Sequence, residues 1–148
     1  GVPTAPNHAI RAECHKQTFA RYPGIKLVAT GVDNDNIETA QKQASAIMQA
    51  HPDLKGWVAS DAAGPVGIGQ AIKESGKAGQ VKMVGLDNLA EVLGLIKDGT
   101  ADSSASSRPE MQGYWSVLSV WQQASGAPAP DHIDTGNVMI SKDNLDSY

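Results

Sequence analysis

Residues Lys55–Gly99 read KGWVASDAAGPVGIGQAIKESGKAGQVKMVGLDNLAEVLGLIKDG, and this stretch decides the fold. It contains two short apolar runs, Trp57–Ala59 and Val81–Val84, and each run leads into a polar turn that carries an aspartate. Apolar residues then recur at helical spacing after each turn. Short apolar strands that alternate with amphipathic helices are typical of parallel βα units, whose ligands bind at the carboxyl ends of the strands. The two aspartates, Asp61 and Asp87, therefore lie where a binding site is expected.

The rest of the chain continues this alternation. A loop at residues 1–6 leads into a helix with Asn7 as its predicted N-cap, and the β-branched run Ile25–Thr30 predicts a strand. A second helix is predicted from Ile37 to Ala50. The later elements that we expect are a short strand within residues 101–107, a helix from Met111 to about Ala124, and a last strand at Ile133–Ile140. This order predicts an α/β protein with a doubly wound, mostly parallel sheet that helices cover on both faces.

The composition favours a globular domain and argues against several classes of partner. The chain has 148 residues, of which 41% are hydrophobic and 19% are charged, and this is enough for one domain with a core. A net charge of −4 without a run of Lys or Arg argues against nucleic acid as a partner. No apolar run approaches the ~20 residues that cross a bilayer. The first residues also lack the basic start and apolar segment of a signal peptide, so we expect a soluble, mature or truncated chain.

Catalytic chemistry is not indicated by the sequence. Cys14 is the only cysteine, so no disulfide forms within the chain. The neighbouring His15 would point about 100° away from Cys14 on a helix, so it does not suit a general base for that thiol. The glycines of residues 64–69 follow the order G-x-x-G-x-G, which differs from the dinucleotide fingerprint. We therefore predict no catalytic residue, no cofactor and no enzymatic activity.

Metal binding is not indicated either. The acidic loop with Asp33, Asp35 and Glu38 lacks the glycine and the distant glutamate of a calcium loop, so helix capping explains it better. The four histidines show no metal-ligand spacing. We predict no metal site.

The order and spacing of several motifs resemble the C-terminal half of type I periplasmic sugar-binding proteins, which serve ABC importers of the ribose, rhamnose and autoinducer-2 kind. The residues that carry the resemblance are the aspartate-tipped strand at Trp57–Asp61, KESGK at Lys73–Lys77, GLD at Gly85–Asp87, IKDGT at Ile96–Thr100, and the tail Asp134–Tyr148. The resemblance covers nearly all of the chain. It implies the type I periplasmic-binding-protein fold, a small sugar or polyol as ligand, importer membrane subunits as partners, and a periplasmic or extracellular location.

The resemblance also implies how the chain is divided. Residues 1–107 would form the C-terminal lobe without its first strand, residues 108–126 a helix that packs on the N-terminal lobe, and residues 127–148 the hinge return with the closing strand and tail. A doubly wound lobe normally begins with a strand, whereas this chain begins with a loop and a helix. We therefore expect the N-terminal half, as a separate fragment or an exchanged copy of the chain, to complete the sheet. Without it, the helix face with Trp115 and Trp121 would be exposed.

The candidate ligand residues follow from the two aspartates. From the residues alone, Asp61 and Asp87 are either helix caps or carboxylates that accept bonds from sugar hydroxyls. The resemblance implies the second role and adds Ser107 or its neighbour Ser106 at the crossing to the first lobe, with Asn7, His8 and Arg11 at the start of the first helix. Asp61 stands where the family has an Asn-Asp pair, and this difference favours the rhamnose or autoinducer-2 branch over ribose.

Two other classes of function remain open. The sugar-sensing core of a LacI-type transcription repressor shares this fold, and a helix-turn-helix in the preceding sequence would reveal it. A sugar-modifying α/β enzyme is the third possibility, and a nucleotide or metal requirement, or turnover of the sugar, would be its sign. For a transport protein we expect hinge closure, because bonds to the sugar from both lobes favour the closed state.

Overall fold

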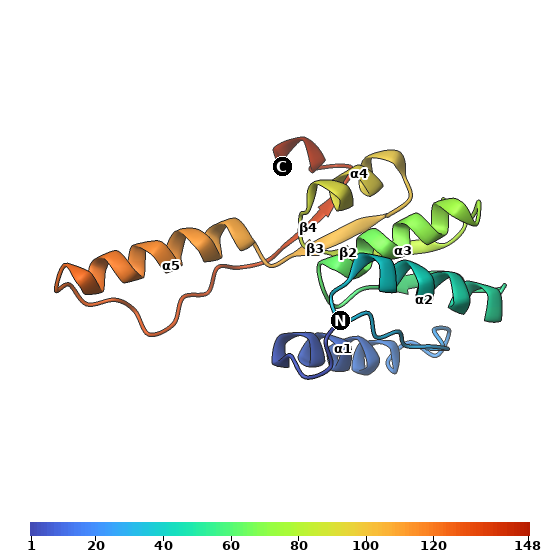
Figure 1. The fold of residues 1–148 in the computed structure, drawn as a ribbon, viewed down its shortest axis with the longest axis horizontal. Helices are drawn as coiled ribbons and strands as arrows, with labels where there is room; N and C mark the ends of the chain where they lie inside the picture. The colour runs from blue at the N-terminus through green and yellow to red at the C-terminus, as the bar shows by residue number, and fades with distance from the viewer.

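The computed structural model describes all 148 residues. Its elements in chain order are the helices α1 (Pro6–Phe19) and α2 (Ile37–Ala50), strand β1 (Gly56–Val58), helix α3 (Ala63–Glu74), strand β2 (Lys82–Leu86), helix α4 (Ala90–Asp98), strand β3 (Ser103–Ser106), helix α5 (Pro109–Ala124), strand β4 (Val138–Ser141) and the 3-10 helix η1 (Leu145–Ser147). Figure 1 shows their arrangement. The helix predicted at residues 37–50 and the strand predicted within residues 101–107 are confirmed.

The four strands form one sheet in the order β1-β2-β3-β4. Strands β1 and β2 are parallel, as are β2 and β3, whereas β4 runs antiparallel to β3. The mostly parallel sheet predicted from the sequence is thus confirmed. The predicted last strand, Ile133–Ile140, begins too early, because the pairing of β4 with β3 ends at Ser106 and Val138 and leaves residues 133–137 without a neighbouring strand.

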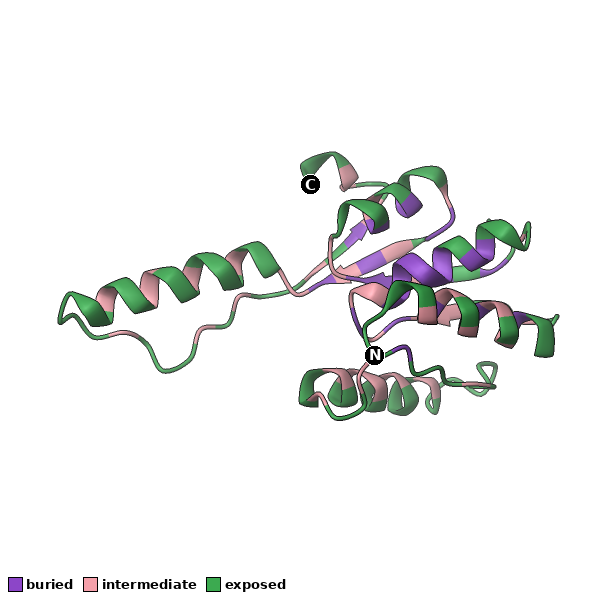
Figure 2. Cartoon of the chain, viewed as in Figure 1, coloured by how far each residue is buried: buried purple, intermediate pink, exposed green.

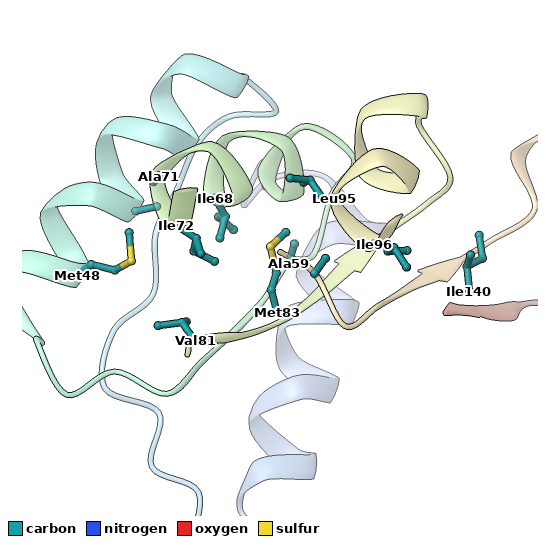
Figure 3. Packing of buried hydrophobic residues seen from close by; sticks show 12 residues of the cluster. Met48, Ala59, Ile68, Ala71, Ile72, Val81, Met83, Leu95, Ile96 and Ile140 are labelled. Atoms are coloured by element: carbon teal, nitrogen blue, oxygen red, sulfur yellow. The ribbon is translucent and has the colours of Figure 1, made fainter. Parts of the chain in front are cut away.

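The hydrophobic core lies between the sheet and the helices α2, α3 and α4, as Figure 3 shows. Its twelve buried residues are Ala44, Met48, Ala59, Ile68, Ala71, Ile72, Val81, Met83, Leu95, Ile96, Ala101 and Ile140. These side chains come from every strand region and from three helices, so the core holds the strands in register. The polar turns that follow β1, β2 and β3 are positioned by this packing.

Helix α1 begins two residues earlier than the sequence analysis predicts. Its N-cap is Ala5, which makes no side-chain hydrogen bond, and Pro6 is the first helical residue. Proline suits this position because its ring presets the helical φ and it lacks the N–H that the first turn leaves unpaired. The prediction of Asn7 as the N-cap is therefore wrong, and Asn7 lies within the first turn. None of the residues of α1 is buried.

The strand predicted at Ile25–Thr30 does not form. This segment, which runs between α1 and α2 (Figure 1), is extended but pairs with no strand, and Ile25 and Leu27 are 50% and 46% exposed. A strand needs a hydrogen-bonded neighbour, and no strand of these 148 residues lies beside this segment. The β-branched composition therefore indicates a strand that has no partner here.

Helix α5 and the segment that returns from it extend away from the rest of the molecule, as Figures 1 and 2 show. No residue of α5 is buried, and Val117 and Trp121 are 73% and 63% exposed. Trp115 is half-buried and packs edge-on against Tyr114. Of the two tryptophans whose exposure the sequence predicts, Trp121 is thus exposed, whereas Trp115 is only partly so. None of the helices has the length and hydropathy needed to cross a membrane.

Candidate functional site

The polar turns that follow β1, β2 and β3 form the candidate site. Because the three strands are neighbours and run parallel, their carboxyl ends lie at the same edge of the sheet. These ends carry Ser60 and Asp61, then Asp87, then Ser106 and Ser107. The sequence therefore predicts correctly which turns come together.

Asp87 is the most tightly held of the candidate residues. Its backbone has a positive φ of 60°, and its N–H donates to the Ala105 carbonyl at 2.9 Å. The Ser104 hydroxyl donates to the Asp87 carbonyl at 2.6 Å. Ser107 donates its N–H and its hydroxyl to the carboxylate Oδ1 at 3.2 and 2.8 Å, whereas no protein group donates to Oδ2. The N-cap of α4 is Leu89, so helix capping does not explain Asp87.

Ser106 and Ser107 differ in their roles. Ser106 is buried, and its hydroxyl oxygen accepts the Arg108 N–H at 3.1 Å. Arg108 also has a positive φ, of 56°, so the chain turns sharply where it leaves the sheet for α5. Ser107 is half-buried and contacts Asp87, as described above. Ser106 thus stabilises the crossing, and Ser107 belongs to the Asp87 site.

Asp61 is buried, with only 1% of its surface exposed. The Gly1 ammonium lies 2.6 Å from Asp33 Oδ1 and 3.6 Å from Asp61 Oδ1, whereas Asp61 Oδ2 has no hydrogen-bond partner. The N-cap of α3 is Ala62, so Asp61 does not cap that helix. Asp61 Oδ2 is therefore a buried acceptor without a protein donor, and the predicted contact of Asp61 with sugar remains a prediction.

The ionisation of this acidic pair follows from burial and mutual repulsion. Burial, with the charge of Asp33 adding to it, raises the pKa of Asp61 to about 6. Burial also acts to raise the pKa of Asp33, but in the 148-residue chain, where Gly1 carries an ammonium, hydrogen bonds from that group and from the Asp35 N–H outweigh it and lower the pKa overall. Near neutral pH the negative charge is thus held more firmly by Asp33 than by Asp61.

The candidates on α1 are placed around the end of β1. Arg11 donates from Nη1 to the Ser60 carbonyl at 3.3 Å, and the His15 Nδ1 lies 3.4 Å from the Ser60 hydroxyl. Burial, followed by the charge of Arg11, lowers the pKa of His15. His8 Nδ1 accepts the Val2 N–H at 3.0 Å, and Asn7 is exposed. Arg11 is thus beside the β1 turn, whereas His8 is engaged by its own loop.

Sequence reasoning missed three residues of this region. Ser60 directly precedes Asp61 at the end of β1, and this position in the sequence could have identified it as a residue of the candidate site. His15 lies four residues after Arg11, on the same helix face, whereas the sequence analysis considers it only as a partner of Cys14 and as a metal ligand. The sequence analysis predicts helix capping for the loop with Asp33, but Asn36 is the residue whose side chain caps α2, by accepting the Thr39 N–H at 2.9 Å.

A cavity of about 810 Å³ lies beside β1. It is bordered by α1, by the unpaired segment 24–31, and by residues of α2 and α3. Its apolar lining includes Phe19, Leu27, Ile47, Trp57 and Ile68. The Trp57 Nε1 atom is buried there without a hydrogen-bond partner. The structure contains no cluster of three or more His, Cys, Asp or Glu residues that could hold a metal ion.

A family model described as a periplasmic binding protein domain matches residues 1–128. The D-ribose/D-allose-binding protein of Pseudomonas aeruginosa is 31% identical over 138 residues, which are 93% of this chain and 43% of the relative. The xylose/arabinose-binding protein of Sulfolobus acidocaldarius is 29% identical over 131 residues, or 84% of this chain and 32% of the relative. The chain thus spans less than half the length of these two relatives.

Solved structures with the same fold include solute-binding proteins of ABC transporters. A periplasmic solute binding protein of an ABC transporter from Actinobacillus succinogenes, with bound D-allose, superposes with a TM-score of 0.93 at 25% identity. The match covers 100% of this chain and 53% of that one. A solute binding protein from Agrobacterium vitis, bound with alpha-D-tagatopyranose, superposes with a TM-score of 0.86 at 27% identity, covering 93% of this chain and 46% of that one.

Proposed function

This chain belongs to the periplasmic binding protein domain family, and from this we propose that it is part of a solute-binding protein that captures a small sugar for an ABC importer. The observation that carries the proposal is the carboxylate of Asp87, held at the carboxyl end of a parallel sheet with Oδ2 free of protein donors. Such an oxygen accepts a sugar hydroxyl without needing a cation beside it.

The relatives support a neutral sugar as the ligand. The two relatives above are named for ribose, allose, xylose and arabinose, and the two solved structures contain allose and tagatose. We therefore place a pentose or a hexose that is not deoxygenated before the rhamnose or autoinducer-2 ligands that the Asp61 position favoured. Arg11, Asn7 and Ser60 are the polar groups that would accompany Asp87. Binding needs no covalent step, so we propose no enzymatic activity.

We place the sugar between two lobes, of which this chain provides most of the second. The segment 108–126, with the exposed α5 face, would pack on the N-terminal lobe, and residues 127–137 would return through the hinge. The exposed apolar residues of α5 support this arrangement, because large exposed apolar faces are typical of interaction surfaces. Hinge closure would follow from bonds that both lobes make to the sugar. The protein would work in the periplasm or outside the cell, with importer membrane subunits as partners.

We also propose that a strand from the N-terminal portion of the protein fills the cavity beside β1. That strand would lie between β1 and segment 25–30 and pair with both. Three observations support this: the unpaired edge of β1, the exposed apolar side chains of Ile25 and Leu27, and the apolar lining with Trp57. The strand could come from the same polypeptide, a separate fragment or an exchanged copy.

Native mass spectrometry beside a denaturing run tests how the sheet is completed. A companion N-terminal fragment with a small retained mass would support a two-lobe binding protein and give the ligand by weight. A homodimer without ligand would mean that the copies complete each other's sheet. A folded, monodisperse 15.5 kDa monomer would refute the proposal that the cavity must be filled.

Calorimetric titration of the whole protein with D-allose and D-ribose tests the function. We expect Asp87→Ala to lower the affinity by ~10-fold or more, because one charged hydrogen bond contributes roughly 1.5–3 kcal/mol. The matched control is Asp53→Ala, which removes an exposed carboxylate from the turn after α2 and should leave the affinity unchanged. Equal affinities for the wild type and Asp87→Ala would remove Asp87 from the site, and turnover of the sugar would favour the enzyme alternative.

A further inference from the structure

Ser107 is bonded to Asp87 through two donors. Its backbone N–H and its hydroxyl donate to the same oxygen, Oδ1, at 3.2 and 2.8 Å. A serine hydroxyl has one proton, so a hydroxyl that donates its hydrogen bond to Asp87 cannot donate another to a ligand. Ser107 therefore has only oxygen lone pairs to offer a sugar hydroxyl, whereas Asp87 keeps Oδ2 for that purpose.

The Asp87 turn needs such support. Its positive φ of 60° is unfavourable for a residue with a side chain, and such a conformation persists only where the surrounding groups hold it. Ser104 and Ala105 hold its backbone from β3, through the hydroxyl-to-carbonyl and N–H-to-carbonyl bonds. Ser107 is the residue that holds its side chain.

Ser107 also contacts both segments that leave the sheet. Its carbonyl accepts the Gln112 Nε2–H of α5 at 2.8 Å and the Thr135 hydroxyl of the returning segment at 3.3 Å. The outgoing and returning chains thus meet at the residue that holds the Asp87 carboxylate. Any rotation of these segments acts directly on the Ser107 backbone.

We propose that Ser107 is a positioning residue, which orients the Asp87 carboxylate for the ligand and couples it to the two crossing segments. This inference rests on the proposed function, since it assumes that Asp87 binds the sugar. It reassigns Ser107 from a direct ligand contact to a residue that acts through Asp87.

A double-mutant cycle in the whole protein tests the inference, with D-allose and D-ribose as ligands. We expect Ser107→Ala to lower the affinity about five- to tenfold, since it removes one hydrogen bond to a charged group. In the Asp87→Ala background the same substitution should change the affinity less than about twofold, because a residue that acts through Asp87 has nothing left to position. Ser116→Ala is the matched control, since the Ser116 hydroxyl bonds only the Gln112 carbonyl within α5.

Independent, additive effects of Ser107→Ala and Asp87→Ala would overturn the inference, because they would mean that Ser107 contacts the sugar itself. An unchanged affinity of Ser107→Ala would overturn it as well. If Ser107 has only a structural role, Ser107→Ala will lower thermal stability and affinity together in both backgrounds. Melting temperatures of the wild type, the two single variants and the double variant therefore complete the cycle.

Two further measurements separate the parts of the proposal. Thr135→Val removes the bond to the Ser107 carbonyl and leaves Asp87 untouched. We therefore expect stopped-flow tryptophan fluorescence to show an altered rate of sugar association. An unaltered rate would contradict the coupling of Ser107 to the returning segment.

Hydrogen exchange of the Ser107 amide tests the Ser107–Asp87 bond without sugar. Exchange of this amide should accelerate in Asp87→Ala. If that acceleration is seen but the wild type binds no sugar, the proposed function fails while the Ser107–Asp87 bond stands.

Discussion

Gly67 of α3 lies directly against the backbone of Ile37 in α2. A Cβ atom at position 67 would overlap the Ile37 carbonyl oxygen and would lie 2.7 Å from both Ala40 Cβ and the Gln41 nitrogen. The helices approach this closely because glycine has no side chain. Since α2 and α3 together cover one side of the core, this contact helps to position the end of β1 and its polar turn.

Gly67→Ala should therefore destabilise the protein. The added methyl group meets backbone atoms, which cannot move aside, and overpacking of this kind costs about 1–3 kcal/mol. The free energy of unfolding, measured by urea denaturation with far-UV circular dichroism, should fall by that amount.

Gly94→Ala is the matched control for this substitution. Gly94 is exposed on α4, and no atom lies within 4 Å of a Cβ built there. Alanine is favoured over glycine inside helices, so this variant should gain about 0.5–1 kcal/mol. Equal changes of the same sign in both variants would show that the close α2–α3 contact does not exist.

The buried Asp61 should make stability depend on pH in an unusual direction. Its pKa of about 6 in the folded protein lies above its usual value of 3.8, so between these values the folded state binds more protons than the unfolded state. Its contribution to the free energy of unfolding therefore falls as the pH rises from about 4 to about 6, and stays constant above that range. Between pH 5 and pH 7 we expect a loss of about 1 kcal/mol from this group.

Asp61→Asn isolates this contribution. The lowered pKa of His15 acts in the opposite direction, because stability from a histidine that is held neutral rises with pH up to about 6.5. The difference between the wild type and Asp61→Asn cancels the His15 effect, since both proteins contain that residue. The wild type should lose stability relative to Asp61→Asn when the pH is raised from 5 to 7 in urea titrations. A constant difference would contradict the raised pKa.

Local patterns predicted the elements whose partners lie within this chain. Helix α2 has the predicted bounds because its apolar residues face α3 and its cap, Asn36, lies next to it in sequence. The sequence predicts Asp87 as a candidate ligand residue because it directly follows a buried strand. In contrast, Ile25–Thr30 has the composition of a strand, but pairing is a property of two segments, and none of the four strands pairs with it.

The site was harder to predict, because its contacts join residues that are far apart in sequence. Asp61 is buried beside Asp33, which lies 28 residues earlier, and no local pattern shows this pairing. Ser107 was named as a ligand residue from its position at the crossing, but its bonds to Asp87 depend on the positive φ of the Asp87 turn. Sequence reasoning therefore identified the turns that form the candidate site, whereas the structure assigns the contacts within it.

The exposed face of α5 leads to a prediction about the two lobes. Val117 is 73% exposed, so Val117→Asn should change the stability of the 148-residue chain by less than about 0.5 kcal/mol. In the whole protein, where we propose that α5 packs on the N-terminal lobe, the same substitution should cost about 1–2 kcal/mol. Gln123→Asn, at an exposed polar position of α5, should have little effect in either form. Equal small effects of Val117→Asn in both forms would argue against the packing of α5.

The unpaired segment Ile25–Thr30 makes the last prediction, which concerns how the cavity beside β1 is filled. In the 148-residue chain the amides of this segment pair with no strand, and only the Ile25 N–H has a backbone partner, the Tyr22 carbonyl at 2.9 Å. The amides of residues 26–30 should therefore exchange with solvent within seconds, as in unstructured chains. If a strand from the N-terminal portion occupies the cavity, the segment gains a neighbour, and its alternate amides become hydrogen-bonded. Hydrogen exchange measured by mass spectrometry on the whole protein should then show slow exchange at residues 25–30 and at β1, with α2 equally protected in both forms. Rapid exchange at residues 25–30 in the whole protein would mean that the sheet ends at β1, and the cavity would then need a different occupant.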